Sequence, residues 1–74
     1  MRVQEFTKIM KKLESTRGRQ FFEEELQHSG WFFLDLTLRQ HNTIVSQLLI
    51  WYEPVEINKK KYVKIPNGLL LEII

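Results

Sequence analysis

The stretch EINKKKYVKIPNG, residues 56–68, points most directly to a fold. Apolar and polar residues alternate through its centre, which is typical of a strand with one buried face. The polar residues 58–60 interrupt the apolar pattern, and this predicts a hairpin tip between strands at 55–57 and 61–65. The C-terminal part of the chain is therefore expected to form an antiparallel sheet.

A second turn signal follows at Asn67-Gly68, between KKYVKIP and LLLEII. Asn-Gly between apolar runs favours a two-residue type I′ turn, which needs positive φ at both central residues. Residues 69–74 are then expected to return as a last strand. A short C-terminal helix is the alternative for this segment.

Two apolar stretches precede the hairpin. WFFLDLTL, residues 31–38, alternates along its length and is rich in aromatic residues, so it predicts a strand. NTIVSQLLIWY, residues 42–52, fits a helical stripe with Asn42 or Thr43 as its cap, although its β-branched content also suits a strand. We favour a helix over 42–52, ended by Pro54.

The N-terminal part predicts two helices. Over residues 3–14 the apolar residues recur at helical spacing, and they are Val3, Phe6, Ile9, Met10 and Leu13. Ser15 to Gly18 breaks this pattern, because glycine is unfavourable inside a helix. A second helix is expected over 19–28, with the acidic residues 23–25 near its start, where they favour the helix dipole.

Length and composition bound the kind of protein. The chain has 74 residues, 43% hydrophobic and 27% charged residues, no cysteine and a net charge of +2. We expect one small α+β domain over 1–74, with a limited core. The start is too charged for a signal peptide and no apolar run is long enough to span a bilayer, so a soluble, cytoplasmic protein is predicted.

Few residues suggest catalysis or metal binding. His28 and His41 have no cysteine or second histidine at ligand spacing, so no metal site is predicted. The glycines are isolated, no serine lies in a nucleophile-elbow pattern, and adjacent glutamates on a helix point in different directions. We therefore expect a binding protein without enzymatic activity and without a cofactor.

A helix at 42–52 followed by a lysine-tipped hairpin resembles a winged-helix DNA-binding domain. The resemblance covers nearly the whole chain, in architecture only. It implies that the third helix enters the major groove of double-stranded DNA, that the hairpin is a wing on the phosphates, and that the protein regulates transcription or replication as a homodimer. The candidate nucleic-acid-binding residues are Arg39, Gln40, Asn42, Thr43, Ser46, Gln47, Lys59, Lys60 and Lys61.

The alternative function is protein–protein interaction, as a small homodimer or an inhibitor of a larger protein partner. It rests on the large apolar content of WFFLDLTL, LLIWY and LLLEII in so short a chain. Aromatic residues are enriched at interface hot spots, and a C-terminal strand can pair with another sheet edge. The candidate interface residues are Trp31, Phe33, Trp51, Tyr52 and Ile73.

Overall fold

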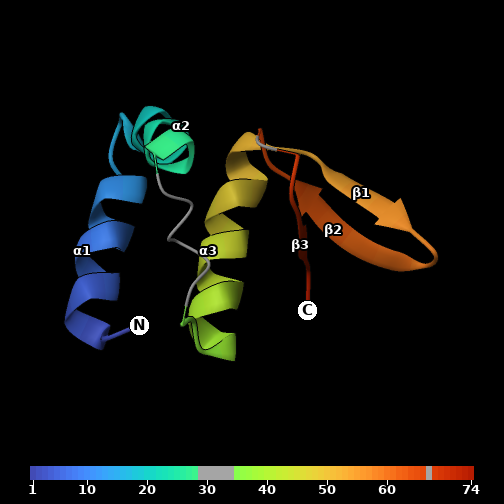
Figure 1. The fold of residues 1–74 in the computed structure, drawn as a ribbon, viewed down its shortest axis with the longest axis horizontal. Coiled ribbons are helices and arrows are strands. Elements are labelled where there is room, and N and C mark those ends of the chain that lie inside the picture. The colour runs from blue at the N-terminus through green and yellow to red at the C-terminus, as the bar shows by residue number, and fades with distance from the viewer. Residues whose placement is uncertain (29–34, 67) are drawn as a thin grey trace.

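Three helices precede a three-stranded antiparallel sheet in a computed structural model that describes residues 1–28, 35–66 and 68–74 (Figure 1). The predicted small α+β domain, with helices first and hairpin strands last, is confirmed. The elements in chain order are α1 (Val3–Leu13), α2 (Gly18–His28), α3 (Leu38–Trp51), β1 (Pro54–Ile57), β2 (Lys60–Lys64) and β3 (Leu70–Glu72).

The first two helices form where the sequence predicts them. The predicted stripe of α1 is buried at Ile9, Met10 and Leu13. Val3, which was expected in the same stripe, is instead 74% exposed. Gly18 is the first residue of α2 and is buried.

Helix α3 begins four residues earlier than predicted, at Leu38 rather than 42. Thr37 is its N-cap: the Gln40 N–H donates to Thr37 Oγ1 at 3.1 Å, and the Thr37 N–H donates to Gln40 Oε1 at 3.1 Å. This reciprocal capping box satisfies two backbone donors and fixes the helix start. The predicted strand at 31–38 is therefore wrong over 35–38, and 31–34 lie outside the described residues.

The sheet has the order β1-β2-β3. The β1–β2 hairpin is confirmed, with φ of 50° at Asn58 and 67° at Lys59. Positive φ at both central residues is the type I′ geometry. The same geometry is predicted at Asn67-Gly68, but Asn67 lies outside the described residues.

Around that position the loop is longer than a two-residue turn would be. The Gly68 N–H donates to Ile65 O at 2.9 Å and the Ile65 N–H donates to Leu69 O at 3.1 Å. Gly68 takes φ 89°, a value that suits glycine. The returning strand β3 is shorter than the predicted 69–74, and no helix forms at the described C-terminus.

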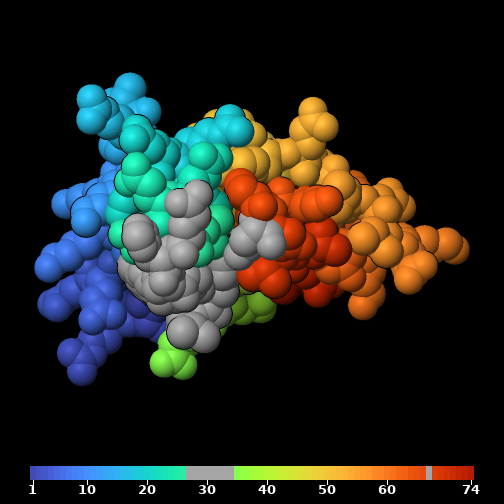
Figure 2. Space-filling view, turned by 45° about the horizontal axis from the view of Figure 1, so that its top comes forward, coloured from blue at the N-terminus to red at the C-terminus, as the bar shows by residue number. Residues whose placement is uncertain are grey.

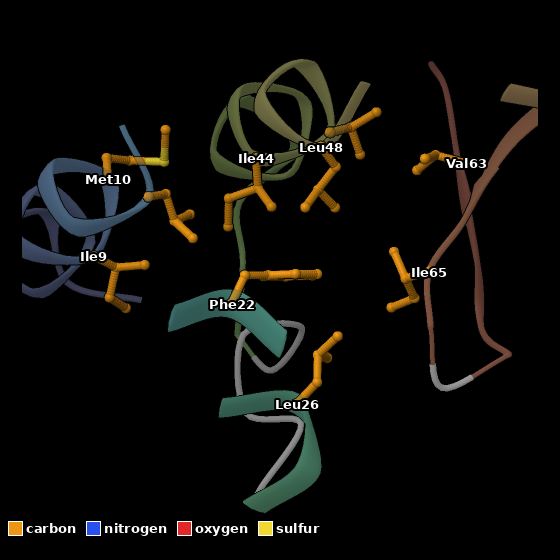
Figure 3. Close-up of a cluster of buried hydrophobic side chains, with 10 residues drawn as sticks. Ile9, Met10, Phe22, Leu26, Ile44, Leu48, Val63 and Ile65 are labelled. Carbon is orange, nitrogen blue, oxygen red and sulfur yellow. The ribbon is translucent and has the colours of Figure 1, made fainter. Parts of the chain in front are cut away.

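Phe22 lies at the centre of the core. Figure 3 shows its ring between Ile9 and Met10 of α1, Ile44 and Leu48 of α3, and Val63 and Ile65 at the sheet. Phe22 is 0% exposed, so its truncation to alanine would cost about 3–5 kcal/mol. The helices therefore pack on one face of the sheet through this ring.

The hairpin of β1 and β2 extends away from the helices. In Figure 1, α1 lies at one end of the longest axis and the hairpin tip at the other, with α3 between them. The molecule measures 35 × 23 × 20 Å, and the space-filling view shows the hairpin as a tapering projection (Figure 2). None of the helices in the described residues combines the length and the apolar character needed to cross a membrane.

Candidate nucleic-acid interface

One face of α3 is free of the core. Arg39, Thr43, Ser46 and Ile50 are exposed and recur at spacings of four, three and four, which places them in one stripe along the helix. The opposite face is buried through Ile44, Val45 and Leu48. Because α3 starts at Leu38, the exposed stripe includes Arg39, which lies before the predicted helix 42–52.

The N-terminal half of this face carries a shallow depression that is widely open to solvent. Leu38, Arg39, Asn42, Thr43 and Ser46 line an open depression of about 460 Å³. It gathers a guanidinium, an amide, two hydroxyls and the side chain of Leu38, which is 61% exposed. A guanidinium or amide group can form two hydrogen bonds with the edge of one base, and apolar groups contact the thymine methyl. The residue types on this face are thus chemically suited to nucleic-acid bases.

The two hydroxyls present acceptors more than donors. Thr43 Oγ1 donates to Arg39 O at 2.9 Å, and Ser46 Oγ donates to Asn42 O at 2.9 Å. Each hydroxyl hydrogen is therefore used within the helix, while the oxygen lone pairs stay available. Among the described residues Arg39 forms no ion pair, so its guanidinium is available to bind a ligand.

Two of the predicted DNA-contacting residues belong to the helix packing instead. Gln40 is 8% exposed, and its Nε2 donates to Met1 O at 2.8 Å while its Oε1 serves the capping box. Gln47 is half-buried, and its Nε2 donates to Leu13 O at 3.4 Å. Gln40 is bonded to the residue at the N-terminus and Gln47 to the end of α1, because both side chains lie on the inward half of α3.

A second hollow lies on the other side of Arg39 and Thr43. It has a volume of about 340 Å³ and its remaining lining is mainly Met1, Val3 and Phe6 of the N-terminal segment. Arg39 and Thr43 line both hollows, so they form a ridge between a polar depression and an apolar one. The exposure of Val3, unexpected from its place in the apolar stripe, is explained by its position at this second hollow.

The hairpin lysines do not share one side of the sheet. Lys59 lies in the turn, whereas Lys61 is paired with Glu56 and falls on the same face as the fully buried Val63. Lys60 and Lys64 lie on the opposite face, because strand residues alternate. Lys64 is exposed and was missed as a candidate; its separation of four from Lys60 was the signal that would have found it.

The predicted interface residues are largely engaged with the core. Trp51, Tyr52 and Ile73 are half-buried and pack against the core cluster. The rings of Trp51 and Phe22 lie 6.2 Å apart between centroids. Trp31 and Phe33 lie outside the described residues.

Tyr52 is fixed by a charged pair from α2. Its hydroxyl donates to Glu23 Oε1 at 2.7 Å, Arg19 Nε donates to the same oxygen at 3.2 Å, and the guanidinium lies 5.1 Å from the centre of the Tyr52 ring. Burial, followed by the bond to Glu23, raises the pKa of Tyr52 to about 12. The bond from Tyr52, followed by that from Arg19, lowers the pKa of Glu23. The cluster ties α2 to the C-terminal end of α3.

His41 connects α3 to the last strand. Its Nε2 lies 2.9 Å from Glu72 O, and since a carbonyl oxygen only accepts, Nε2 carries the hydrogen. In the part of the chain that the structure describes, no group of three His, Cys, Asp or Glu side chains could hold a metal ion. Searches against protein-family models, curated proteins and solved structures found no match.

Proposed function

We propose that this protein is a non-enzymatic DNA-binding module of the winged-helix type that regulates transcription or replication. Helix α3 enters the major groove of double-stranded DNA and the β1–β2 hairpin acts as a wing on the phosphates. The observation that carries the proposal is the open face of α3 that the core does not cover, where Arg39 and Asn42 lie beside Thr43 and Ser46. Arginine reads guanine and asparagine reads adenine through paired hydrogen bonds.

The charge of the hairpin supports the same function. Residues 54–64 carry four lysines and one glutamate, a net charge of 4 − 1 = +3 in a protein whose total is +2. This charge is concentrated on the element that extends farthest from the helices (Figure 1). Neutralising phosphates with such a projection would strengthen binding in a salt-dependent way.

The first test is fluorescence anisotropy of labelled duplex DNA at several salt concentrations. The wing variant combines Lys59→Gly, Lys60→Gln and Lys64→Gln; glycine is chosen at Lys59 because φ is 67° there. If all three lysines contact phosphates, the slope of log affinity against log salt should decrease by about 2.7, or ~0.9 for each contact.

The matched control removes the same charge from the other end of the molecule, through Lys8→Gln, Lys11→Gln and Arg17→Gln, which are exposed. It should leave most of the slope unchanged. A second variant, Arg39→Gln with Asn42→Ala, should weaken binding to a selected sequence by roughly 1–3 kcal/mol per lost base contact. Equal losses in the wing and control variants, or no duplex binding at about 50 mM salt, would contradict the proposal.

The second candidate function, protein–protein interaction as a homodimer or with a larger partner, is favoured by one observation. Leu38 and Ile50 are 61% and 72% exposed near the two ends of the α3 face. Exposed apolar side chains are the groups that a protein contact would cover. Light scattering measures the molar mass of the wild type and of Ile50→Asp. A dimer mass that falls to the monomer mass in the variant supports this function, and a wild-type monomer at high concentration excludes the homodimer.

A further inference from the structure

The sheet has a face that the core does not use. In β2, Val63 is 0% exposed and lies on the inner face toward the helices, so the alternating residues Lys60, Tyr62 and Lys64 lie on the outer face. Directly paired residues on neighbouring strands point to the same side. The outer face therefore consists of Val55, Ile57, Lys60, Tyr62, Lys64, Leu70 and Glu72.

Apolar residues surround the ring of Tyr62 on this face. Val55 is paired directly with Tyr62, while Ile57 and Leu70 are paired with the two flanking lysines. Tyr62 and Val55 are half-buried although neither packs against the core cluster. Within the described residues the Tyr62 side chain makes no hydrogen bond and no contact with another aromatic ring. The edges of the Tyr62 ring are thus flanked by apolar side chains, and its outer face is accessible to a ligand.

The charges on the outer face have a regular placement. Lys60 and Lys64 lie two residues before and after Tyr62, about 7 Å away on each side along the strand. Glu72 is paired with Tyr62 on β3 and is exposed. The face carries two lysines and one glutamate, 2 − 1 = +1, and Lys59 adds a further positive charge at the tip.

We propose that this outer face binds a single strand of nucleic acid, with one base stacked on Tyr62 and its neighbouring phosphates held by Lys60 and Lys64. Glu72 accepts a hydrogen bond from an exocyclic amino group of the stacked base, which favours cytosine over thymine or uracil. An aromatic ring with flanking cations is the arrangement by which proteins hold single strands, since every base has a face to stack. The site goes beyond the duplex site on α3, because a paired base offers no free face.

Other occupants fit the charges or the aromatic ring of this outer face less well. A second copy of the chain would bring two sets of lysines into a shared, poorly solvated contact, with one glutamate on each copy to offset them. A duplex could use Lys60 and Lys64 through its phosphates but would leave the Tyr62 ring without a partner. The pairing of a half-buried aromatic ring on the outer face with lysines on both sides therefore favours the single strand.

The test measures anisotropy of labelled oligocytidine, oligothymidine and a duplex of about 12 nucleotides or base pairs. Tyr62→Val removes the ring and keeps a strand-forming residue, while Tyr62→Phe keeps the ring. We expect Tyr62→Val to bind the single strands about tenfold more weakly, with duplex binding unchanged. Tyr62→Phe should bind them as the wild type does, and Glu72→Gln should reduce the preference for oligocytidine.

Several results would overturn the proposal. These are no binding of the wild type to either oligonucleotide at about 50 mM salt, equal affinity of Tyr62→Val and wild type, or a wild-type dimer that Tyr62→Val converts to monomer. Far-UV circular dichroism establishes that each variant is folded. Arg39→Gln with Asn42→Ala serves as the converse variant, since it should affect only the duplex, so failure of the duplex function and failure of this site give different results.

Discussion

Replacing Gly18 by alanine tests the close approach of α2 to α1. A Cβ on Gly18 would lie 1.8 Å from the Leu13 carbonyl oxygen and 2.5 Å from its carbon. Ordinary contacts of a Cβ begin at 3.4 Å, so the shortfall is 3.4 − 1.8 = 1.6 Å. The neighbour is backbone and cannot rotate away, so the first turn of α2 would have to move and would disturb the packing of Phe22.

Two effects oppose each other in this variant. Alanine in place of glycine inside a helix gains up to about 1 kcal/mol, and less at the first helical residue. Forcing extra volume into a packed site costs about 1–3 kcal/mol, and a backbone neighbour favours the upper part of that range. We expect a net loss of about 2 kcal/mol, from a total of roughly 4–11 kcal/mol for a domain of this size.

Urea denaturation followed by far-UV circular dichroism measures the loss, and the melting temperature should fall by roughly 8–16 °C. Thr7→Ala is the control, because Thr7 is exposed in α1 and gains the helix propensity of alanine without a clash. Gly18→Ala as stable as the wild type, or more stable, would refute the close approach of the two helices.

Three further predictions concern Tyr52, Lys59 and Gln40. Because the pKa of Tyr52 is raised to about 12, its contribution to stability should be complete below pH 10.0 and disappear as the pH rises through 12. The pKa of Glu23 is lowered, so the contribution of Glu23 to stability should disappear as the pH falls through its lowered pKa. Tyr52→Phe should abolish the loss of stability at alkaline pH and cost about 1 kcal/mol at neutral pH, because the hydrogen bond from Tyr52 to Glu23 is partly exposed. Urea denaturation at a series of pH values measures both effects. Lys59→Gly should raise the stability by about 1 kcal/mol, since glycine takes the positive φ at this turn position without strain, and a thermal melt showing no gain would contradict the type I′ geometry. Gln40→Ala should cost roughly 1–2 kcal/mol through the lost capping box and the bond to Met1, whereas Asn42→Ala on the outer side of the same turn should cost less by the same denaturation assay.

Local patterns were enough to predict α1, α2 and the β1–β2 hairpin. In each of these elements the apolar residues follow a single period, and a break in the pattern, such as Ser15 to Gly18, separates one element from the next. The start of α3 was missed although Thr37 and Gln40 have the spacing of a capping box. The alternating apolar residues around Thr37 suggested a strand, and the cap overrode that pattern.

The candidate site was harder to predict than the elements. Exposure on α3 depends on which side faces α1, and shifting the helix start moved Arg39 onto the helix and Gln40 into its packing. The three consecutive lysines suggested one basic tip, yet strand alternation separates Lys60 from Lys61. The contact of Gly18 with Leu13 depends on tertiary packing, which no local pattern contains.

The hydrogen bond between His41 and Glu72 limits how the sheet can grow. Residues 65 and 73 bond across to the partner strand, so the Glu72 carbonyl points outward from the β3 edge, where His41 of α3 occupies it. On the opposite edge β1 is short and begins with Pro54, which has no N–H to offer. Exposed strand edges are the usual starting points of intermolecular β-aggregation. One imidazole and one proline thus reduce the backbone groups that the two sheet edges offer to a strand of another chain.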